Sequence, residues 1–394
     1  MITLLIVSKT NAIIQQKDDY KTYYVDANAP DGGNGSEATP FNSFEKVVGY
    51  FDNGNYMPGL LRGGDHLYLK GSFTSDEHDE VTNNKRLVLY RPAQGGTAEK
   101  PTIIKSYGKK KAVFDPNYSY IDPVHVRNIG GNGSYVVIKD IVVTRSSGRG
   151  IMIGDGVGSA TLSGILAYNN QANGGMGSGG AVVFDLFKGK SNHVIYDSTF
   201  YNNRIDPDGH PDNRGAISIL SKPTAADGST VQIVNNVFRD EHIAIRQKHS
   251  GNVTTTIEGN QISNCTIGVF LRAFENHVIR NRFRNVETVI SVSEGNANGN
   301  LKEVIKENQI NGARTFIDKG GNTEFSHDYE VTENSFTSEN VRAIFNLSQF
   351  SNINFDLSRF KVSGNTFDVP ESAVLLIHKA KKHGFDEGMR ILKR

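Results

Sequence analysis

Two cationic side chains, Lys248 and Arg272, end two segments of similar sequence, Ile243–Lys248 and Ile267–Arg272. If these segments are stacked strands, the two side chains share a column and lie roughly 4.8 Å apart. Stacked cations repel each other, and such a conflict is tolerated mainly at functional sites. A second cation also disfavours the ammonium form of the lysine, which suits a general base. The plainer interpretation is that both side chains extend into water, at a cost of only about tenths of a kcal/mol.

Other charged residues accompany this pair. Through segment 180–185, Asp185 falls in the same column two rungs earlier. Between positions 239 and 284 cationic residues outnumber acidic ones, a distribution that suits an anionic chain lying along the molecule. We expect those beside turns, such as Arg280 and Arg282, to be ordinary solvent-facing residues. The cationic residues of this stretch are Arg239, Arg246, Lys248, Arg272, Arg280, Arg282 and Arg284, with His242, His249 and His277.

A second candidate is the acidic loop 206–213, which reads Asp-Pro-Asp-Gly-His-Pro-Asp-Asn. Oxygen-rich side chains around a glycine turn are the ligands that Ca²⁺ requires. Their spacing does not match the helix–loop–helix calcium site of about 12 residues. A plain loop that protrudes from a rung is therefore the favoured interpretation.

An internal repeat predicts the elements that position these residues. An asparagine, a variable residue and then Phe, Ile or Val recur every 21 to 31 residues, among β-forming residues and the turn formers Asn and Gly. One unit is too short to contain a real helix and cannot bury its apolar face alone, so the units must stack. The recurring asparagines would then share amide hydrogen bonds along the stack. They are Asn236, Asn260, Asn281, Asn308, Asn334 and Asn365.

This pattern predicts an all-β fold, a single-stranded right-handed parallel β-helix, and neither a leucine-rich repeat nor a propeller. We expect residues 21–60 to form an N-terminal cap region, 61–378 the β-helix and 379–394 a basic C-terminal tail or cap. Segment 40–51, with Phe44, Val47, Val48 and Phe51 at helical spacing, predicts a short cap helix. Residues 1–20, which include a short apolar run without a basic start, are either a leader remnant or a disordered arm.

Composition narrows the classes of function. A formal net charge of +1 over 394 residues gives no global field that would attract nucleic acid or a membrane surface. The only cysteine, Cys265, excludes an intrachain disulfide framework and a thiolate metal cluster. No segment approaches the roughly 18 apolar residues of a membrane-spanning helix.

Two parts of the sequence resemble known families. Segments 23–26 and 34–41 look like the start of many secreted bacterial β-helix proteins, including pectate lyases of family nine. Segments 241–248 and 268–272 are similar to the active-site strands of polysaccharide lyase family six, which contains chondroitinase B and alginate lyases. This resemblance implies Lys248 as the base, Arg272 as its partner and Glu241 as a ligand of Ca²⁺. Ile243 stands where a second Glu ligand would be expected.

Together these observations predict a secreted, periplasmic or cell-surface enzyme that cleaves an acidic polysaccharide by β-elimination, with Ca²⁺ as an implied cofactor. The candidate proton donors are His249, Arg272 and a nearby tyrosine, among which the sequence does not choose. Arg246, Asp185 and Arg214 are candidate contacts to the substrate. One alternative is a glycoside hydrolase with two carboxylates about 5 to 9.5 Å apart. Asp185 with Asp206, Asp208 or Glu294 could supply such a pair.

Another alternative is a carbohydrate-binding adhesin or spike protein without catalysis, because β-helices support many functions.

Overall fold

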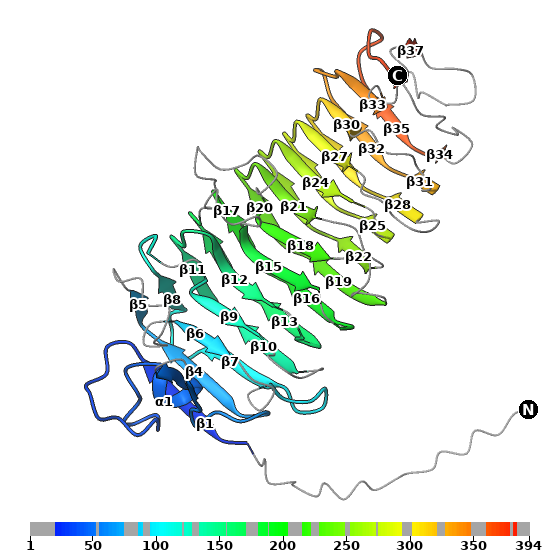
Figure 1. Ribbon diagram of the computed structural model, residues 1–394. Coiled ribbons are helices and arrows are strands. Elements are labelled where there is room, and N and C mark those ends of the chain that lie inside the picture. Colours follow the sequence, from blue (N-terminus) through cyan, green and yellow to red (C-terminus); the bar gives the residue numbers. More distant parts are fainter. Residues whose placement is uncertain are drawn as a thin grey trace, which may run out of the picture.

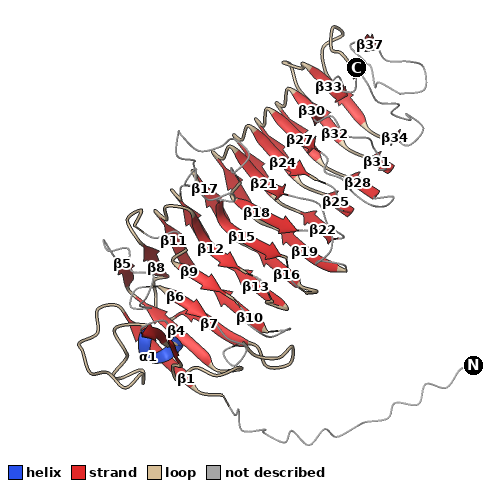
Figure 2. Ribbon diagram, viewed as in Figure 1, coloured by secondary structure: helices blue, strands red, loops and turns tan. Residues whose placement is uncertain are grey.

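A right-handed parallel β-helix forms the molecule, in which each turn of the chain contributes one short strand to each of three sheets (Figures 1 and 2). The strands of each sheet stack along one long axis. The sheets, which we call I, II and III in the order in which the chain visits them, contain 12, 11 and 12 strands of the described residues. The computed structural model describes residues 20–52, 55–74, 86–89, 95–119, 122–127, 134–154, 156–170, 180–187, 189–203, 215–221, 228–248, 253–272, 275–293, 302–320, 328–347, 360–378 and 381–383.

The strands follow one another at each position of the rung. Sheet I contains β1 (Thr22–Asp26), β4 (His66–Lys70), β7 (Thr102–Ser106), β10 (Tyr135–Lys139), β13 (Ser159–Ser163), β16 (Asn192–Tyr196), β19 (Ser229–Val234), β22 (Val253–Glu258), β25 (Glu275–Ile279), β28 (Lys302–Lys306), β31 (Asp328–Thr332) and β34 (Phe360–Ser363). Sheet II contains β5 (Ser72–Thr74), β8 (Ala112–Asp115), β11 (Ile141–Thr144), β14 (Leu166–Tyr168), β17 (Thr199–Tyr201), β20 (Val237–Arg239), β23 (Gln261–Ser263), β26 (Arg282–Arg284), β29 (Gln309–Asn311), β32 (Ser335–Thr337) and β35 (Thr366–Asp368).

Sheet III carries the strands of the candidate site. It contains β6 (Leu87–Leu89), β9 (Val124–Val126), β12 (Arg149–Ile153), β15 (Gly180–Leu186), β18 (Ile217–Ser221), β21 (Ile243–Lys248), β24 (Ile267–Leu271), β27 (Thr288–Ser293), β30 (Thr315–Gly320), β33 (Ala343–Leu347), β36 (Leu376–His378) and β37 (Lys381–His383). Neighbouring strands of this sheet pair in parallel, except that β37, in the segment predicted as the tail, pairs antiparallel with β36.

The predicted asparagine ladder is confirmed. From Asn236 to Asn334, the backbone N–H and the side-chain Nδ2 of each asparagine donate to the Oδ1 of the next one, over 2.8 to 3.1 Å. The residue before each ladder asparagine has a positive φ, as Arg280 (56°) and Glu307 (57°) do, so the chain turns sharply there. The ladder fixes the rungs one above another, because each buried amide is hydrogen-bonded by its neighbours.

The N-terminal end differs in detail from the prediction. Helix α1 covers only Glu45–Val48, and Gly49 ends it with φ 87°, so the chain continues into the antiparallel strands β2 (Tyr50–Asp52) and β3 (Asn55–Met57). Phe44, Val47 and Val48 are fully buried, as their spacing predicted. Strand β1 already pairs with β4, so the stack begins within the segment predicted as a cap.

Alternating side chains fill the interior of the stack, as the period of two in a strand requires. In β21, Ile245 belongs to this core and Gln247 is fully buried beside it, while Lys248 is half-buried at the end of the strand. Among the described residues, no helix is long and apolar enough to span a membrane.

Candidate functional site

The predicted column on sheet III is present. Ile243 and Ile245 pair with Ile267 and Val269, so the same register carries Lys248 to the level of Arg272. Lys248 pairs with Leu220, and Leu220 pairs with Asp185. The alignment of these strands from sequence is therefore confirmed, with Asp185 two rungs before Lys248.

A buried glutamine fixes the end of this column. The Oε1 atom of Gln247 accepts the backbone N–H of Arg272 at 2.8 Å, and its Nε2 donates to Asn276 and to Thr255. The guanidinium of Arg272 lies 5.5 Å from the ring centroid of Phe270. Gln247 is fully buried, whereas Lys248 and Arg272 are each half-buried. The two cations are thus held by the core on one side and reach the surface on the other.

Arg246 lies deeper than the predicted substrate contact requires. Its side chain is on the outward side of sheet III, beside Ser218 and Phe270 in the register, yet it is only 2% exposed. Gly215 makes room for it, because a Cβ at that position would lie 2.9 Å from the Cβ of Arg246. Its burial favours a role in holding this face together over direct contact with a polymer.

Apolar side chains separate Asp185 from Lys248. Met152, Val183 and Leu220 form a small buried cluster on the outward side of sheet III, apart from the core of the stack. The Oδ1 atom of Asp185 accepts the backbone N–H of Phe187 at 3.3 Å. Two rungs correspond to about 10 Å between backbones, so Asp185 and Lys248 are parts of one face rather than neighbours.

The structure gives Glu241 another role than that of a calcium ligand. Its carboxylate is 3% exposed and accepts the backbone N–H of Asn203 at 3.1 Å and the Nδ2 of Asn203 at 2.7 Å. Asn203 in turn accepts from Asn170 at 2.9 and 3.2 Å. Glu241 therefore belongs to a second, shorter ladder inside a corner of the rungs, and the prediction that it binds Ca²⁺ does not fit this geometry.

Within the described residues, no three His, Cys, Asp or Glu side chains gather into a group that could hold a metal ion. Several predicted residues lie outside the described part of the chain, namely His249, Arg214, Glu294 and the acidic loop 206–213.

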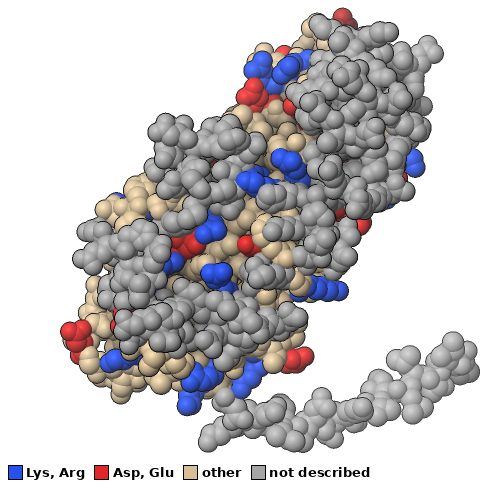
Figure 3. Space-filling model, viewed as in Figure 1, with Lys and Arg blue, Asp and Glu red and all other residues tan. Residues whose placement is uncertain are grey.

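The cationic residues between positions 239 and 284 are divided between two sheets and a corner. Arg239 belongs to β20 and Arg282 and Arg284 to β26, all in sheet II, and all three are exposed. Arg280 lies at a corner, where it pairs with Glu258 and, at 3.3 Å, with Glu307. Of the members of this set that the structure describes, Arg246 and Lys248 lie on sheet III and Arg272 directly follows its strand β24. Figure 3 shows Lys and Arg side chains on the visible face next to Asp and Glu side chains.

A second charged group on sheet III escaped the sequence interpretation. Arg149 binds Asp122 with two hydrogen bonds, Nε to Oδ1 at 2.6 Å and Nη2 to Oδ2 at 2.7 Å. The Nε of Arg86 donates to the backbone carbonyl of Asp122 at 3.3 Å, and Nδ1 of His125 lies 3.5 Å from its Oδ2. Burial and the nearby arginines, Arg149 foremost, hold the pKa of His125 well below its usual range, so the imidazole is neutral.

This second group shares a face with the Lys248 column. Val126, Ile153 and Phe184 pair in successive strands, so the residues that follow them, Arg127, Gly154 and Asp185, also lie in one column. This is the column of Lys248, and exposed Arg127 lies four rungs before it. A Cβ on Gly154 would lie 3.2 Å from Cγ of Arg127 and 3.6 Å from Nε2 of His125. A side chain at Gly154 would therefore crowd both Arg127 and His125. No local motif could have revealed this group, because stacking alone brings its members together.

Comparison with known proteins supports the fold. No protein family model matches the chain, and no curated protein matches it. The structure is similar to that of pectate lyase Pel9A, with a TM-score of 0.51 and 16% identity over 86% of this chain and 79% of that chain. A GH136 lacto-N-biosidase from Eubacterium ramulus gives a TM-score of 0.49 and 13% identity over 89% of this chain and 68% of that chain. A rhamnogalacturonan lyase gives 0.40 and 12% over 80% and 87%. At these identities only the likeness to Pel9A carries weight, and it shows a shared β-helix fold.

Proposed function

We propose that this chain is an enzyme that cleaves an acidic polysaccharide by β-elimination. The observation that carries the proposal is the stacking of Lys248 and Arg272 at the ends of neighbouring strands, half-buried on the outward side of sheet III. The β-helix fold is shared with pectate lyase Pel9A, so a lyase is consistent with the fold by analogy.

The two cations can divide the chemistry between them. Arg272 pairs with the carboxylate of a uronate, which makes the proton on the adjacent carbon more acidic. Lys248 takes that proton as a neutral amine, a form that the positive charge of Arg272 favours. The electron pair left on carbon forms a double bond while the bond to the leaving sugar oxygen breaks. That oxygen receives a proton from His249, the proposed donor. Lys248 then returns its proton to water and His249 takes one from water, which restores both groups.

The core of the stack supports this arrangement. Gln247 holds the backbone of Arg272 through one hydrogen bond and is itself fixed by Thr255 and Asn276, so the end of β24 cannot move independently of β21. Reacting groups held on a rigid scaffold need less reorganisation during the reaction. No step of this proposal requires a metal ion, and the assay below includes calcium as a variable.

The test compares Lys248→Ala and Arg272→Ala with the parent and with Lys190→Ala, which removes an exposed lysine between β15 and β16. Each protein is mixed with polygalacturonate, alginate or chondroitin sulfate, with and without Ca²⁺, and the ultraviolet absorbance of unsaturated uronate is followed. We expect the parent and the control to act on at least one polymer. Both site variants should lose about 100-fold or more in rate, the scale of a lost acid–base group.

Two other outcomes would contradict the proposal. Reducing ends that appear without unsaturation indicate hydrolysis by a pair of carboxylates. Binding without any cleavage across the panel indicates a carbohydrate-binding protein.

A further inference from the structure

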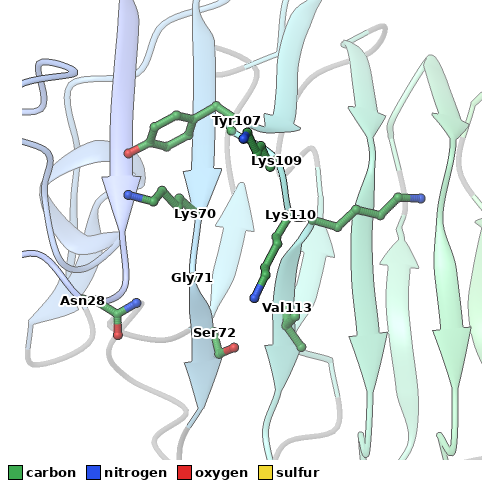
Figure 4. Close-up of a pocket in the computed structure, with 10 residues that line it drawn as sticks. Asn28, Lys70, Gly71, Ser72, Tyr107, Lys109, Lys110 and Val113 are labelled. Carbon is green, nitrogen blue, oxygen red and sulfur yellow. The ribbon is translucent and has the colours of Figure 1, made fainter.

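A pocket of about 420 Å³ opens at the corner between sheets I and II, in the first rungs of the stack. Figure 4 shows Tyr107 and Lys70 extending in the same direction, with Asn28 and Ser72 beyond them and Lys109 and Lys110 on the neighbouring turn. This corner lies on other sheets than the Lys248 column. The pocket is lined by Asn28, Lys70, Gly71, Ser72, Tyr107, Gly108, Lys109, Lys110, Lys111 and Val113.

Two glycines with positive φ shape the pocket. Gly71 (φ 86°) ends β4, and Gly108 (φ 85°) follows Tyr107 in the turn after β7. A Cβ on Gly71 would lie 3.0 Å from Nδ2 of Asn28 and 3.1 Å from Cβ of Ala27, so a side chain there would fill the floor. The chain therefore makes a defined recess here rather than a flat corner.

The lining contains four lysines and no acidic residue, while the carboxylate of Glu37 lies close by, hydrogen-bonded to Tyr24. Lys70 pairs with Asp26 at 2.8 Å, and Nζ of Lys111 donates to the carbonyl of Gly164 at 2.5 Å. Lys109 and Lys110 are exposed, and within the described residues neither has an acidic partner. Two ammonium groups are thus available to an anionic ligand.

A surface of aromatic rings continues from the pocket. The ring centroid of Tyr107 lies 5.0 Å from that of Tyr24, which lies 5.3 Å from that of Tyr68. His66 continues the row, 5.9 Å from Tyr68, and the Nζ of Lys105 lies 4.5 Å from the Tyr68 centroid. All of these side chains are half-buried on the outward side of sheet I. We call them, with the pocket, the tyrosine–lysine surface.

Rings and ammonium groups side by side suit a ligand that is both cyclic and acidic. Aromatic rings present apolar area with a polar edge, against which the apolar faces of sugar rings can pack. The lysines can pair with carboxylate or sulfate groups. An inorganic anion would use only the lysines, whereas an acidic sugar chain would use both parts and has the length to span them.

We propose that the tyrosine–lysine surface is a binding site for an anionic polysaccharide, separate from the face that carries Lys248. It would hold a segment of polymer while another segment lies on sheet III. The inference does not require Lys248 to be catalytic, because it concerns binding at a different place on the stack.

The test measures binding without cleavage, in full-length protein that carries Lys248→Ala. Affinity electrophoresis is run in gels that contain polygalacturonate, alginate or chondroitin sulfate, which separates carboxylated from sulfated ligands. The double variant Lys109→Ala/Lys110→Ala should bind at least one polymer about 3- to 30-fold more weakly, the scale of two exposed ion pairs. Tyr107→Leu should also weaken binding, because it removes the ring and keeps apolar volume.

The matched control is Lys190→Ala/Lys361→Ala, which removes two exposed lysines elsewhere. It should bind as the parent does. Equal loss in both double variants, or retention of a random DNA duplex with the same dependence on Lys109 and Lys110, would overturn the inference in favour of general attraction to polyanions. Unchanged binding of the Lys109/Lys110 variant, or no binding to any polymer, would overturn it as well. Failure of the lyase assay alone would leave this result intact, so the two proposals fail separately.

Discussion

At the scale of single residues, two ionisable side chains in the core stand out. Lys319 pairs with Val292 in the register, points into the stack and is 2% exposed, and burial lowers its pKa to about 5. Glu303 is fully buried, accepts the Nδ2 of Asn276 at 3.0 Å, and its pKa is raised well above the usual value, also by burial. Both groups thus favour their neutral forms inside the protein.

Lys319 makes the stability of the fold depend on pH. Its pKa is about 5 when folded and 10.5 when unfolded, so between these values the unfolded chain binds a proton that the folded chain does not. The contribution of Lys319 to stability therefore rises with pH across this window, while that of Glu303, whose pKa is raised in the folded protein, has the opposite sign. The variant Lys319→Met should lose this slope and gain at least about 1 kcal/mol at neutral pH, since each pKa unit corresponds to about 1.4 kcal/mol.

Denaturant unfolding of both proteins at about pH 6 and about pH 9 checks this. The control is Lys361→Met, which changes an exposed lysine on the outer side of β34 and should keep the slope of the parent. An equal slope in Lys319→Met and the parent would contradict the assignment.

At the scale of elements, the asparagine ladder joins the rungs. Asn281 accepts the N–H and the Nδ2 of Asn260, and its own Nδ2 donates to the carbonyl of Ile257 at 2.8 Å and to Oδ1 of Asn308 at 3.0 Å. These hydrogen bonds link each rung to the rungs before and after it. The same ladder sets the register that brings Lys248 and Arg272 to one level.

Substitution in the middle of the ladder should be costly. Asn281→Ala leaves the buried donors of Asn260 without their acceptor, at about 1 to 3 kcal/mol for each lost partner. We expect unfolding free energy to fall by about 3 kcal/mol, measured by denaturant titration. Gln309→Ala, an exposed change in the nearby strand β29, should change it by less than about 0.5 kcal/mol. A similar small effect for Asn281→Ala would show that the ladder contributes little.

At the scale of the whole molecule, one face of sheet III carries both charged groups. Arg127 and Lys248 are four rungs apart, or about 19 Å along the stack. A long anionic chain that reaches Lys248 could therefore pair with Arg127, and a short oligosaccharide could not.

The length of the substrate should consequently reveal this contact. Arg127→Ala should raise KM for a long polymer about 2- to 5-fold at unchanged kcat, the scale of one exposed ion pair, and leave KM for short oligosaccharides unchanged. Arg282→Ala, which removes an exposed arginine from sheet II, is the control and should alter neither. Steady-state kinetics on both substrates distinguish these outcomes. An equal effect of Arg127→Ala on short and long substrates would contradict the proposal that a polymer bound at Lys248 also reaches Arg127.

Much of this architecture could be predicted from the sequence. The spacing of the asparagines predicted the stacked rungs and their ladder, and the alternation in segments 243–248 and 267–272 predicted that Lys248 and Arg272 share a column. Both signals are local and periodic, because each residue of a rung meets the equivalent residue of the next one.

Only the tertiary structure decided which polar side chains are buried and which groups meet across rungs. The carboxylate of Glu241 points into a corner of the rungs, where it is hydrogen-bonded to Asn203. Arg246 is buried although its position in the strand faces outward. Asp122 and Arg149 become neighbours because the register of β9 and β12 places them at one level, and Tyr107 meets Tyr24 across β4 in the same stack. The sequence by itself therefore determined the repeat, the ladder and the Lys248 column. The corners depend on the geometry of the turns, and the surfaces that span several rungs depend on which strand stacks on which, and only the tertiary structure shows either of these.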